Sequence, residues 1–401
     1  MNPFPSGLTR EDVLSLGRTV PKKDQLVFLG RPTFSDNTKY LYLTALRRGL
    51  PAIWCSIHEN LVLELKRNGL PALHLTRNEE SFYTLLSASH VFHSVSPIEA
   101  MGGDQLLEAA IVHSRNIMLW HGISLKYLCL QRVENEGVFS PRMRFWLSSA
   151  GSNVALSTSA CFDSYWVEVF NVRTLIRSGF PRNEVILREA FEHELIGASL
   201  TDQLVEKLSN GKPNVLIAPT WGGGNAGNES KSLMDAAFIE KFSELASTYQ
   251  INIFLKRHHA SHNQDQDLGL LLQGRGITLV PAGLDVYPWL KYFSLLMTDY
   301  SSIMFDFMLT GNPVVRLETQ RSLAGMLEPA LHFMPENLPT YDIEVAGDLD
   351  RLFSVEFVDS LKVDRERFIK RIFETSPIDA SNQLIDKLGL MNKSPEPLVV
   401  L

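Results

Sequence analysis

The sequence predicts an α/β protein built from two successive Rossmann-like halves that face a common cleft. Short apolar runs alternate with longer helical patterns, which is typical of parallel strands joined by helical crossovers. A polar stretch at 209–213 separates two such series. The length of 401 residues exceeds what one hydrophobic core usually serves. We therefore expect domains at 1–208 and 209–375, followed by a C-terminal helix and tail at 376–401.

The first series opens with a predicted strand at 26–29 and a helix at 37–48. A second strand and helix follow at 52–56 and 60–67. Short apolar runs predict the remaining strands of this half, at 72–75, 91–94, 116–120, 153–157 and 184–187.

The second series opens with a strand at 214–218 and a long helix at 232–248. Its other predicted strands are 251–255, 277–280, 294–298 and 313–317. Ligands of such sheets bind beyond the carboxyl ends of the strands. Polar residues that directly follow a strand are therefore the candidates for function. The final residues, SPEPLVVL, have the composition of a tail.

The charge balance and the cysteines narrow the class of protein. The chain has 38 Lys and Arg against 45 Asp and Glu, a net charge of −7, which disfavours nucleic-acid binding through a broad basic surface. Its 3 cysteines have no CxxC spacing and suit a reducing cytoplasm. No signal peptide and no apolar stretch of about 20 residues is present, so we expect a protein that is not inserted in a membrane.

The richest candidate site is the segment 294–309, where an apolar strand runs into a polar turn and then a helix. Ser301 and Ser302 stand at the expected helix start. Backbone amides and hydroxyl groups there would suit a phosphate or diphosphate. The alternative interpretation is an ordinary capped helix start.

The second candidate is His121, which directly follows a predicted strand and should project into the cleft. A histidine there can take a proton from a hydroxyl nucleophile. Gly122 would allow close approach of a ligand or backbone, and Lys126 could pair with a phosphate. The alternative is a histidine whose hydrogen bonds are satisfied inside a loop.

Two further loops follow strands. Lys256, Arg257 and His258 offer cationic donors for phosphate, although a solvated basic turn is the alternative. His258 and His262 have the spacing of a metal pair but lack an HExxH motif, so no metal is expected. Gly222 and Gly223 belong to a glycine loop at 221–225 that is neither GxGxxG nor a P-loop. The absence of a GxSxG motif disfavours an α/β-type serine hydrolase.

Several of these segments together resemble the CDP-glycerol glycerophosphotransferase family, which builds teichoic acids and related capsule polymers. The most specific match is TDYSSIMFDFMLTGNPVV at 298–315, and LWHGISLK at 119–126 is similar to the family's WHGxxLK box. Further matches, in the family's order, are FSDNTKYLYL at 34–43, SGFPRNE at 178–184, APTW at 218–221 and LKRH at 255–258.

The resemblance implies a GT-B architecture, with an acceptor-side N-terminal domain and a nucleotide-donor C-terminal domain. It implies transfer of glycerol phosphate from CDP-glycerol, as donor substrate, to a hydroxyl group with release of CMP, and no cofactor. His121 matches the family's catalytic base and His258 its second essential histidine. Thr298, Asp299, Ser301 and Ser302 match the donor-phosphate turn. The acceptor would be lipid-linked or polymeric, at the cytoplasmic face of the cell membrane.

The chain also departs from the family pattern. Gly222 to Gly224 stand where many members carry an arginine, and His259 stands where proline is usual. A CDP-ribitol donor or a nucleotide sugar on the same fold therefore remains an alternative. A further alternative is a protein that transfers nothing, either epimerase-like or catalytically silent. The segment PRMRFWL at 141–147 would suit an interfacial helix on anionic lipid, or a buried helix with two exposed arginines.

Overall fold

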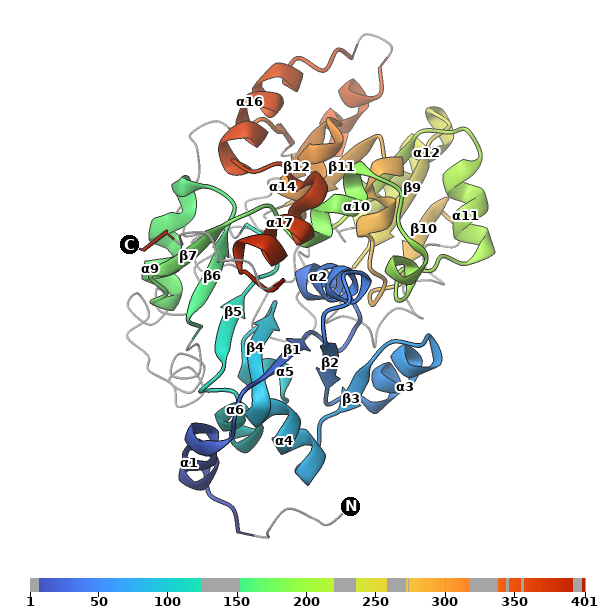
Figure 1. Ribbon diagram of the computed structural model, residues 1–401. Helices are drawn as coiled ribbons and strands as arrows, with labels where there is room; N and C mark the ends of the chain where they lie inside the picture. Colours follow the sequence, from blue (N-terminus) through green and yellow to red (C-terminus); the bar gives the residue numbers. More distant parts are fainter. Residues whose placement is uncertain are drawn as a thin grey trace.

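Two largely parallel β-sheets form the framework of the protein, as the computed structural model in Figure 1 shows. The structure describes residues 7–123, 152–219, 236–257, 272, 274–299, 301–317, 338–343, 346–354, 357–391 and 399–400.

The first sheet has the strand order β14-β7-β6-β5-β4-β1-β2-β3. Its strands are β1 (Lys23–Leu29), β2 (Ala52–Ser56), β3 (Ala72–His74), β4 (Ala88–His93), β5 (Arg115–Met118), β6 (Val154–Ser157), β7 (Thr174–Arg177) and β14 (Val399–Val400). All neighbouring pairs are parallel except β14, which runs antiparallel to β7. The parallel arrangement expected from the alternating pattern is confirmed.

Helices cover both faces of the first sheet because its strands are apolar on both sides. In β1, Leu26 and Phe28 join one hydrophobic cluster, whereas Val27 and Leu29 join another on the opposite face. The first face is packed against α2 (Asp36–Arg47) and α3 (Glu59–Arg67). The second is packed against α1 (Arg10–Thr19), α4 (Glu79–Ser87), α5 (Pro97–Ala100) and α6 (Gln105–Ala110). At β5 and β6, α9 (Asp163–Phe170) packs through a separate aromatic cluster.

The second sheet has the order β10-β9-β8-β11-β12-β13 and is parallel throughout. Its strands are β8 (Asn214–Ile217), β9 (Asn252–Lys256), β10 (Ile277–Val280), β11 (Leu295–Thr298), β12 (Val314–Leu317) and β13 (Tyr341–Ile343). One face packs against α12 (Ala236–Thr248) and the 3₁₀ helix η7 (Ala346–Leu352). Leu216 and Leu296, on the other face, belong to the same cluster as Phe28 of the first sheet, so one apolar core joins the two sheets.

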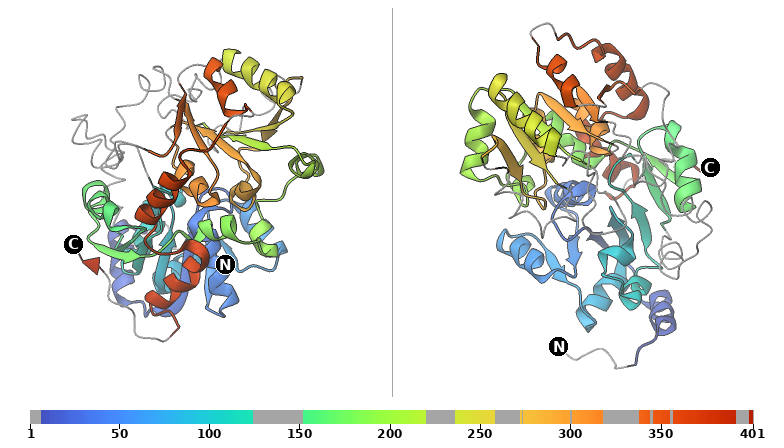
Figure 2. Two further views of the ribbon diagram at one scale, coloured as in Figure 1. Left: turned by 90° about the horizontal axis from the view of Figure 1, so that it is seen from above. Right: turned by 180° about the vertical axis from the view of Figure 1, so that it is seen from behind.

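Helix α2 lies between the two sheets, in the view of Figure 1 and in the back view of Figure 2. Every residue of α2 from Asp36 to Ala45 is buried. Its polar residues therefore need partners inside the protein. The buried Lys39 ammonium lies 2.8 Å from Asp285 Oδ2, and the Tyr40 hydroxyl donates to the same oxygen over 2.7 Å. Because Asp285 follows β10 of the second sheet, these contacts tie the two halves together.

The C-terminal region returns to the first half of the chain. It contains α16 (Lys362–Ile372), the 3₁₀ helix η8 (Pro377–Asp379) and α17 (Ala380–Lys387). The Ser381 amide donates to Glu184 Oε1 over 2.6 Å, and the Lys387 ammonium donates to the Arg177 carbonyl over 2.7 Å. The expectation of a tail is wrong for the last strand, because β14 pairs with β7. Figure 1 shows the C-terminus beside that edge.

One predicted strand is also wrong. Residues 184–187 form a short helix, α10 (Glu184–Leu187), that continues directly from the 3₁₀ helix η2 (Pro181–Asn183). Proline at the first position of η2 pre-sets a helical φ, and a four-residue apolar run cannot by itself distinguish a strand from a buried helix. The strand that does complete this half, β7, lies ten residues earlier. The other predicted strands are observed within about three residues of the predicted bounds.

No helix among the described residues is both long enough and apolar enough to cross a membrane.

Candidate active site

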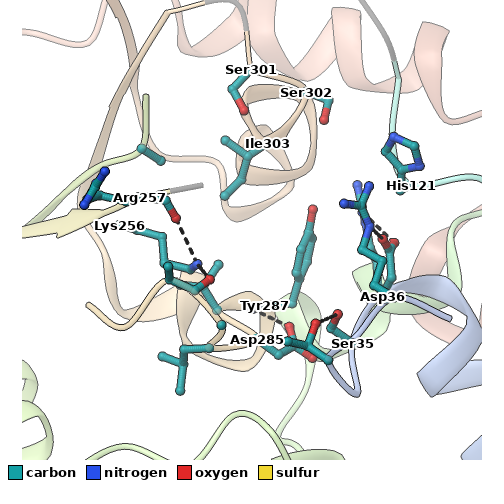
Figure 3. A pocket seen from close by; sticks show the side chains of 18 of the residues that line it. Ser35, Asp36, His121, Lys256, Arg257, Asp285, Tyr287, Ser301, Ser302 and Ile303 are labelled. Atoms are coloured by element: carbon teal, nitrogen blue, oxygen red, sulfur yellow. Dashed lines mark hydrogen bonds and ion pairs between the residues drawn. The ribbon is translucent and has the colours of Figure 1, made fainter. Parts of the chain in front are cut away.

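A pocket of about 200 Å³ opens where the carboxyl ends of strands from both sheets meet. Its walls come from residues at or after the carboxyl ends of β1, β5, β7, β8, β9, β10 and β11, as expected for ligand sites of parallel sheets. Its lining includes Arg31, Asp36, His121, Arg182, Lys256, Arg257, Asp285, Tyr287, Ser301 and Ser302. Figure 3 shows His121 on one side of this pocket, Lys256 and Arg257 on the other, and the two serines above.

His121 occupies the wall contributed by the first sheet, three residues after β5 ends. Its Nδ1 lies 2.8 Å from the backbone carbonyl oxygen of Ser94, which follows β4. A carbonyl oxygen can only accept, so Nδ1 must carry the proton and Nε2 of the neutral ring holds the lone pair. The ring also packs against Trp120, with centroids 4.0 Å apart and the two ring planes tilted by 34°. The backbone contact therefore selects the tautomer that leaves Nε2 as the basic nitrogen.

Gly122 directly follows His121 and is closely approached by side chains from both halves. Its φ is +126°, a conformation that residues with a side chain rarely adopt. A Cβ atom here would lie 2.6 Å from Nη2 of Arg182 and 2.9 Å from Oγ of Ser302. The close approach predicted at Gly122 is thus made by two side chains, one of them from the opposite wall.

Ser301 and Ser302 follow β11 and occupy the opposite wall. Ser302 is the N-cap residue of α14 (Ile303–Phe307), as predicted, but its side chain makes no capping hydrogen bond. The helix spans 5 residues and continues into the 3₁₀ helix η6 (Met308–Thr310), so helical backbone extends through the end of the predicted segment at 309. Both serine side chains are partly exposed in the pocket.

Thr298 and Asp299 lie beneath this wall and do not line the pocket. Both residues are fully buried. The Thr298 hydroxyl donates to the carbonyl oxygen of Ala218 over 2.6 Å, which joins the ends of β11 and β8. The structure thus separates the four residues of the predicted donor-phosphate turn into two that face the pocket and two that support it.

Lys256 and Arg257 form the basic wall at the end of β9. The Lys256 ammonium donates to the carbonyl oxygens of Ala282, over 2.6 Å, and Arg257, over 3.3 Å. The Arg257 side chain lines the pocket although the residue is buried. Two cationic side chains therefore face His121 across the pocket.

A buried hydrogen-bond network around Arg182 connects residues of the two walls. Its guanidinium donates from Nη1 to Asp36 Oδ1 over 2.8 Å and from Nη2 to Asp306 Oδ2 over 2.6 Å. The Tyr287 hydroxyl donates to the same Asp306 oxygen over 2.8 Å, and the Arg182 guanidinium lies over the Tyr287 ring. Burial lowers the pKa of Arg182, but Asp306, Tyr287 and Asp36 outweigh it and the pKa is raised. Burial first, then Asp306 and Asp36, raises the pKa of Tyr287 well above its usual value, although Arg182 opposes the shift.

Sequence reasoning did not single out Arg31, Asp36, Arg182, Asp285 or Tyr287. Arg182 and Asp36 lie within the segments SGFPRNE and FSDNTKYLYL, whose only signal is the resemblance to the family. Their pairing joins elements 146 residues apart, and no local pattern signals such a contact. Asp36 itself has φ +72°, a left-handed conformation that composition does not reveal.

Several predicted site residues lie outside the described residues: Lys126, Gly222, Gly223, His258 and His262, and the whole segment 141–147. Among the residues that the structure describes, no group of three or more His, Cys, Asp or Glu side chains could hold a metal ion.

Some known proteins resemble this chain in sequence, and some solved structures resemble it in fold. A teichoic acid poly(glycerol phosphate) polymerase of Staphylococcus epidermidis is 23% identical over 370 residues, 86% of this chain and 47% of the relative. The polymerase of the same name from Bacillus subtilis (strain 168) is 27% identical over 254 residues, 61% of this chain and 30% of the relative. The chain thus spans half or less of the length of these two relatives.

Comparison with solved structures identifies the type of fold. The wall teichoic acid polymerase TagF superposes with a TM-score of 0.68 at 20% identity, covering 94% of this chain and 92% of that one. Anabaena HepE in complex with UDP-glucose superposes with a TM-score of 0.54 at 11% identity, covering 91% and 99%. The two parallel sheets form a GT-B-type fold, as expected. The sequence model of the CDP-glycerol:poly(glycerophosphate) glycerophosphotransferases matches residues 14–351, and the chain therefore belongs to that family.

Proposed function

We propose that the protein transfers glycerol phosphate from CDP-glycerol to a hydroxyl group of a teichoic-type polymer or lipid-linked acceptor and releases CMP. The observation that carries this proposal is the pocket in which a histidine of fixed tautomer faces two serines and two cationic side chains. Family membership supplies the donor class. The acceptor class comes from the names of the relatives, teichoic acid poly(glycerol phosphate) polymerases.

In this proposal the acceptor hydroxyl attacks the phosphorus atom that bears glycerol. Nε2 of His121 takes the hydroxyl proton as the new phosphorus–oxygen bond forms. The bond from that phosphorus to the bridging oxygen breaks, and CMP leaves with this oxygen. A single in-line displacement of this kind inverts the configuration at phosphorus.

The opposite wall would hold the donor phosphates. Ser301 and Ser302 offer hydroxyl groups, and Lys256 and Arg257 offer cationic donors that match phosphate oxygens. Such groups stabilise the charge that develops on the phosphoryl and leaving oxygens. Thr298 would act by fixing this wall, since its hydroxyl is bonded to Ala218. His258, Lys126, Gly222 and Gly223 remain part of the proposal through the family resemblance.

Each half of the chain has its own role in this proposal. The half up to 208 would bind the acceptor and the half from 209 to 375 the nucleotide, with transfer in the pocket between them. Contact with a membrane surface would bring the protein to a lipid-linked acceptor on the cytoplasmic side.

Separate incubations with three candidate donors test the proposal. The protein is incubated with a synthetic alkyl-linked oligo(glycerol phosphate) and, separately, CDP-glycerol, CDP-ribitol or UDP-glucose, and nucleotide release and extension of the acceptor are measured. We expect CMP release and a product longer by glycerol phosphate with CDP-glycerol. Turnover of CDP-ribitol alone would reassign the donor. Turnover of UDP-glucose alone, the ligand in the HepE structure, would contradict phosphate transfer.

A further inference from the structure

We infer that Asn37 is the positioning residue that fixes His121 in its reactive orientation. The inference rests on the proposed role of His121 as the general base. Asn37 lies in the first turn of α2 and is fully buried. It does not line the pocket, so it would act through His121 and not by touching a substrate.

The carboxamide of Asn37 holds the backbone directly before His121. Its Nδ2 donates to the carbonyl oxygen of Trp120 over 2.8 Å and to that of Leu119 over 3.3 Å. Its Oδ1 accepts the backbone amide of Arg182 over 3.2 Å. One side chain therefore binds both the strand exit that carries His121 and the segment that carries the buried guanidinium.

The backbone that Asn37 holds is strained. Trp120 has φ +56°, a left-handed conformation that a bulky residue rarely adopts. Such a conformation persists only where the surrounding structure holds it, and it is concentrated at functional sites. The Trp120 carbonyl belongs to the peptide that leads into His121, so releasing it would let this peptide rotate and redirect the imidazole.

Thr38, the next residue of α2, contacts Ser94, whose carbonyl oxygen is hydrogen-bonded to the imidazole. The backbone amide of Thr38 donates to Oγ of Ser94 over 3.1 Å, and the Ser94 carbonyl accepts from His121 Nδ1. Consecutive residues of one buried helix thus hold the chain before His121 and the carbonyl that sets its tautomer. Because α2 is also tied to Asp285 by Lys39, this support is anchored in both halves.

Asparagine suits this position chemically. Two backbone carbonyls and one backbone amide surround the side chain, and only an amide offers two donors and an acceptor on one short stem. Aspartate would place carboxylate oxygens against carbonyl oxygens, and leucine would leave buried polar groups without partners.

The test compares Asn37→Ala with a matched control, Asn116→Ala. Asn116 is also buried, lies at the start of β5, and donates from Nδ2 to the carbonyls of Ile111 and Ser114 over 2.9 and 3.0 Å. Truncation removes similar hydrogen bonds in both variants, but only Asn37 contacts the chain beside His121. Asn37→Ser is a milder second variant if the alanine protein folds poorly.

With CDP-glycerol and alkyl-linked oligo(glycerol phosphate), we expect Asn37→Ala to lower kcat by roughly 10- to 100-fold while KM for CDP-glycerol changes little. Asn116→Ala should leave kcat unchanged. In a double-mutant cycle, Asn37→Ala should have little further effect once His121 is replaced by asparagine. An unchanged kcat, or losses that multiply, would overturn the inference.

The orientation of His121 is also measured without turnover, by ¹⁵N NMR of the imidazole, with its signals assigned by loss in His121→Asn. We expect the Nδ1-protonated tautomer in the wild-type protein and in Asn116→Ala, and a mixed or shifted signal in Asn37→Ala. An unchanged signal in Asn37→Ala overturns the positioning role even if the chosen acceptor is not used. Activity that survives His121→Asn would instead overturn the proposed role of His121 as the general base.

Discussion

Nδ1 of His121 lies 2.8 Å from the backbone carbonyl oxygen of Ser94, and this one contact determines which nitrogen can act as a base. Replacement of His121 by asparagine tests that assignment, because the asparagine amide can still donate to the Ser94 carbonyl but offers no basic nitrogen. General-base catalysis typically contributes 10²–10⁴-fold, so we expect kcat to fall by about that factor. CMP release at saturating CDP-glycerol measures the effect.

Binding of CDP-glycerol, measured by calorimetry, is the control for His121→Asn. The donor phosphates are assigned to the opposite wall, so the Kd for CDP-glycerol should change by less than about threefold, under 1 kcal/mol. A Kd that rises as much as kcat falls would mean that His121 binds the donor and is not the base.

Gly122→Ala should impair both folding and activity, and Gly311→Ala is its matched control. Both glycines have positive φ, +126° at Gly122 and +79° at Gly311. Both variants therefore incur backbone strain of about 1–3 kcal/mol, the larger share at Gly122, whose φ lies beyond the left-handed helical region. Only at Gly122 would the new Cβ meet neighbours, Arg182 and Ser302. We therefore expect a further loss of about 1–3 kcal/mol in Gly122→Ala and a displaced serine wall. Chemical denaturation and the Kd for CDP-glycerol measure the two effects.

Equal stability losses in Gly122→Ala and Gly311→Ala, with donor binding intact, would show that the close approach of Arg182 and Ser302 to Gly122 affects neither stability nor donor binding.

Arg182→Met should destabilise the protein strongly because it removes the cation from buried Asp306 and leaves buried Asp36 with the more distant Arg31, at 3.5 Å. Removing one partner of a buried ion pair typically costs about 3–5 kcal/mol. The double variant Arg182→Met with Asp306→Asn should recover part of this loss, since one of the two carboxylates is then neutral. Urea denaturation measures both. A double variant no more stable than Arg182→Met would argue against an electrostatic cause.

The sequence was informative about the sheets because their strands are short apolar runs buried on both faces. Runs such as LVFL in β1 can only be accommodated between two layers of helices. The same criterion failed for EVIL at 184–187, because a four-residue apolar run fits a buried helix equally well. It also missed β13, a strand of 3 residues at the edge of the second sheet.

Residues that line the pocket were predictable only where they directly follow a predicted strand. His121, Lys256, Ser301 and Ser302 were found in this way, and the pocket brings them together. Residues that act through long-range contacts were not found. Asn37, for example, reaches Trp120 across 83 residues, and nothing in its local sequence distinguishes it from a helix-start asparagine.

Lys256→Gln should weaken binding of CDP-glycerol. The ammonium lines the pocket and is held there by the Ala282 carbonyl, so a phosphate would meet a cation of fixed position. Hydrogen bonds to charged groups contribute about 1.5–3 kcal/mol, which corresponds to a Kd roughly 10- to 100-fold higher. Lys212→Gln, at an exposed lysine bonded to Gln250, is the control and should leave the Kd unchanged. Calorimetric titration with CDP-glycerol distinguishes the two variants, and equal Kd values would refute the assignment.

The buried His93 should make the protein less stable in mild acid. Burial lowers its pKa to about 4, and the backbone carbonyl of Val95, which accepts from Nδ1, opposes this shift only weakly. In the unfolded chain the pKa of histidine is near 6.5, so between these pH values the unfolded state binds more protons than the folded state. The stability contributed by neutral His93 is therefore fully present above pH 6.5 and is lost as the pH falls towards 4, by about 3 kcal/mol in all.

Replacement of His93 by asparagine tests this origin of the pH dependence, because asparagine can donate to the Val95 carbonyl but does not titrate. The slope of unfolding free energy against pH between 4 and 6.5, from urea denaturation, should decrease in His93→Asn. It should not vanish, since His90 on the same strand also has its pKa lowered to about 4, mainly by burial. The same substitution at the exposed His113 is the matched control. A slope in His93→Asn equal to that of the wild-type protein would mean that protonation of His93 does not destabilise the folded protein.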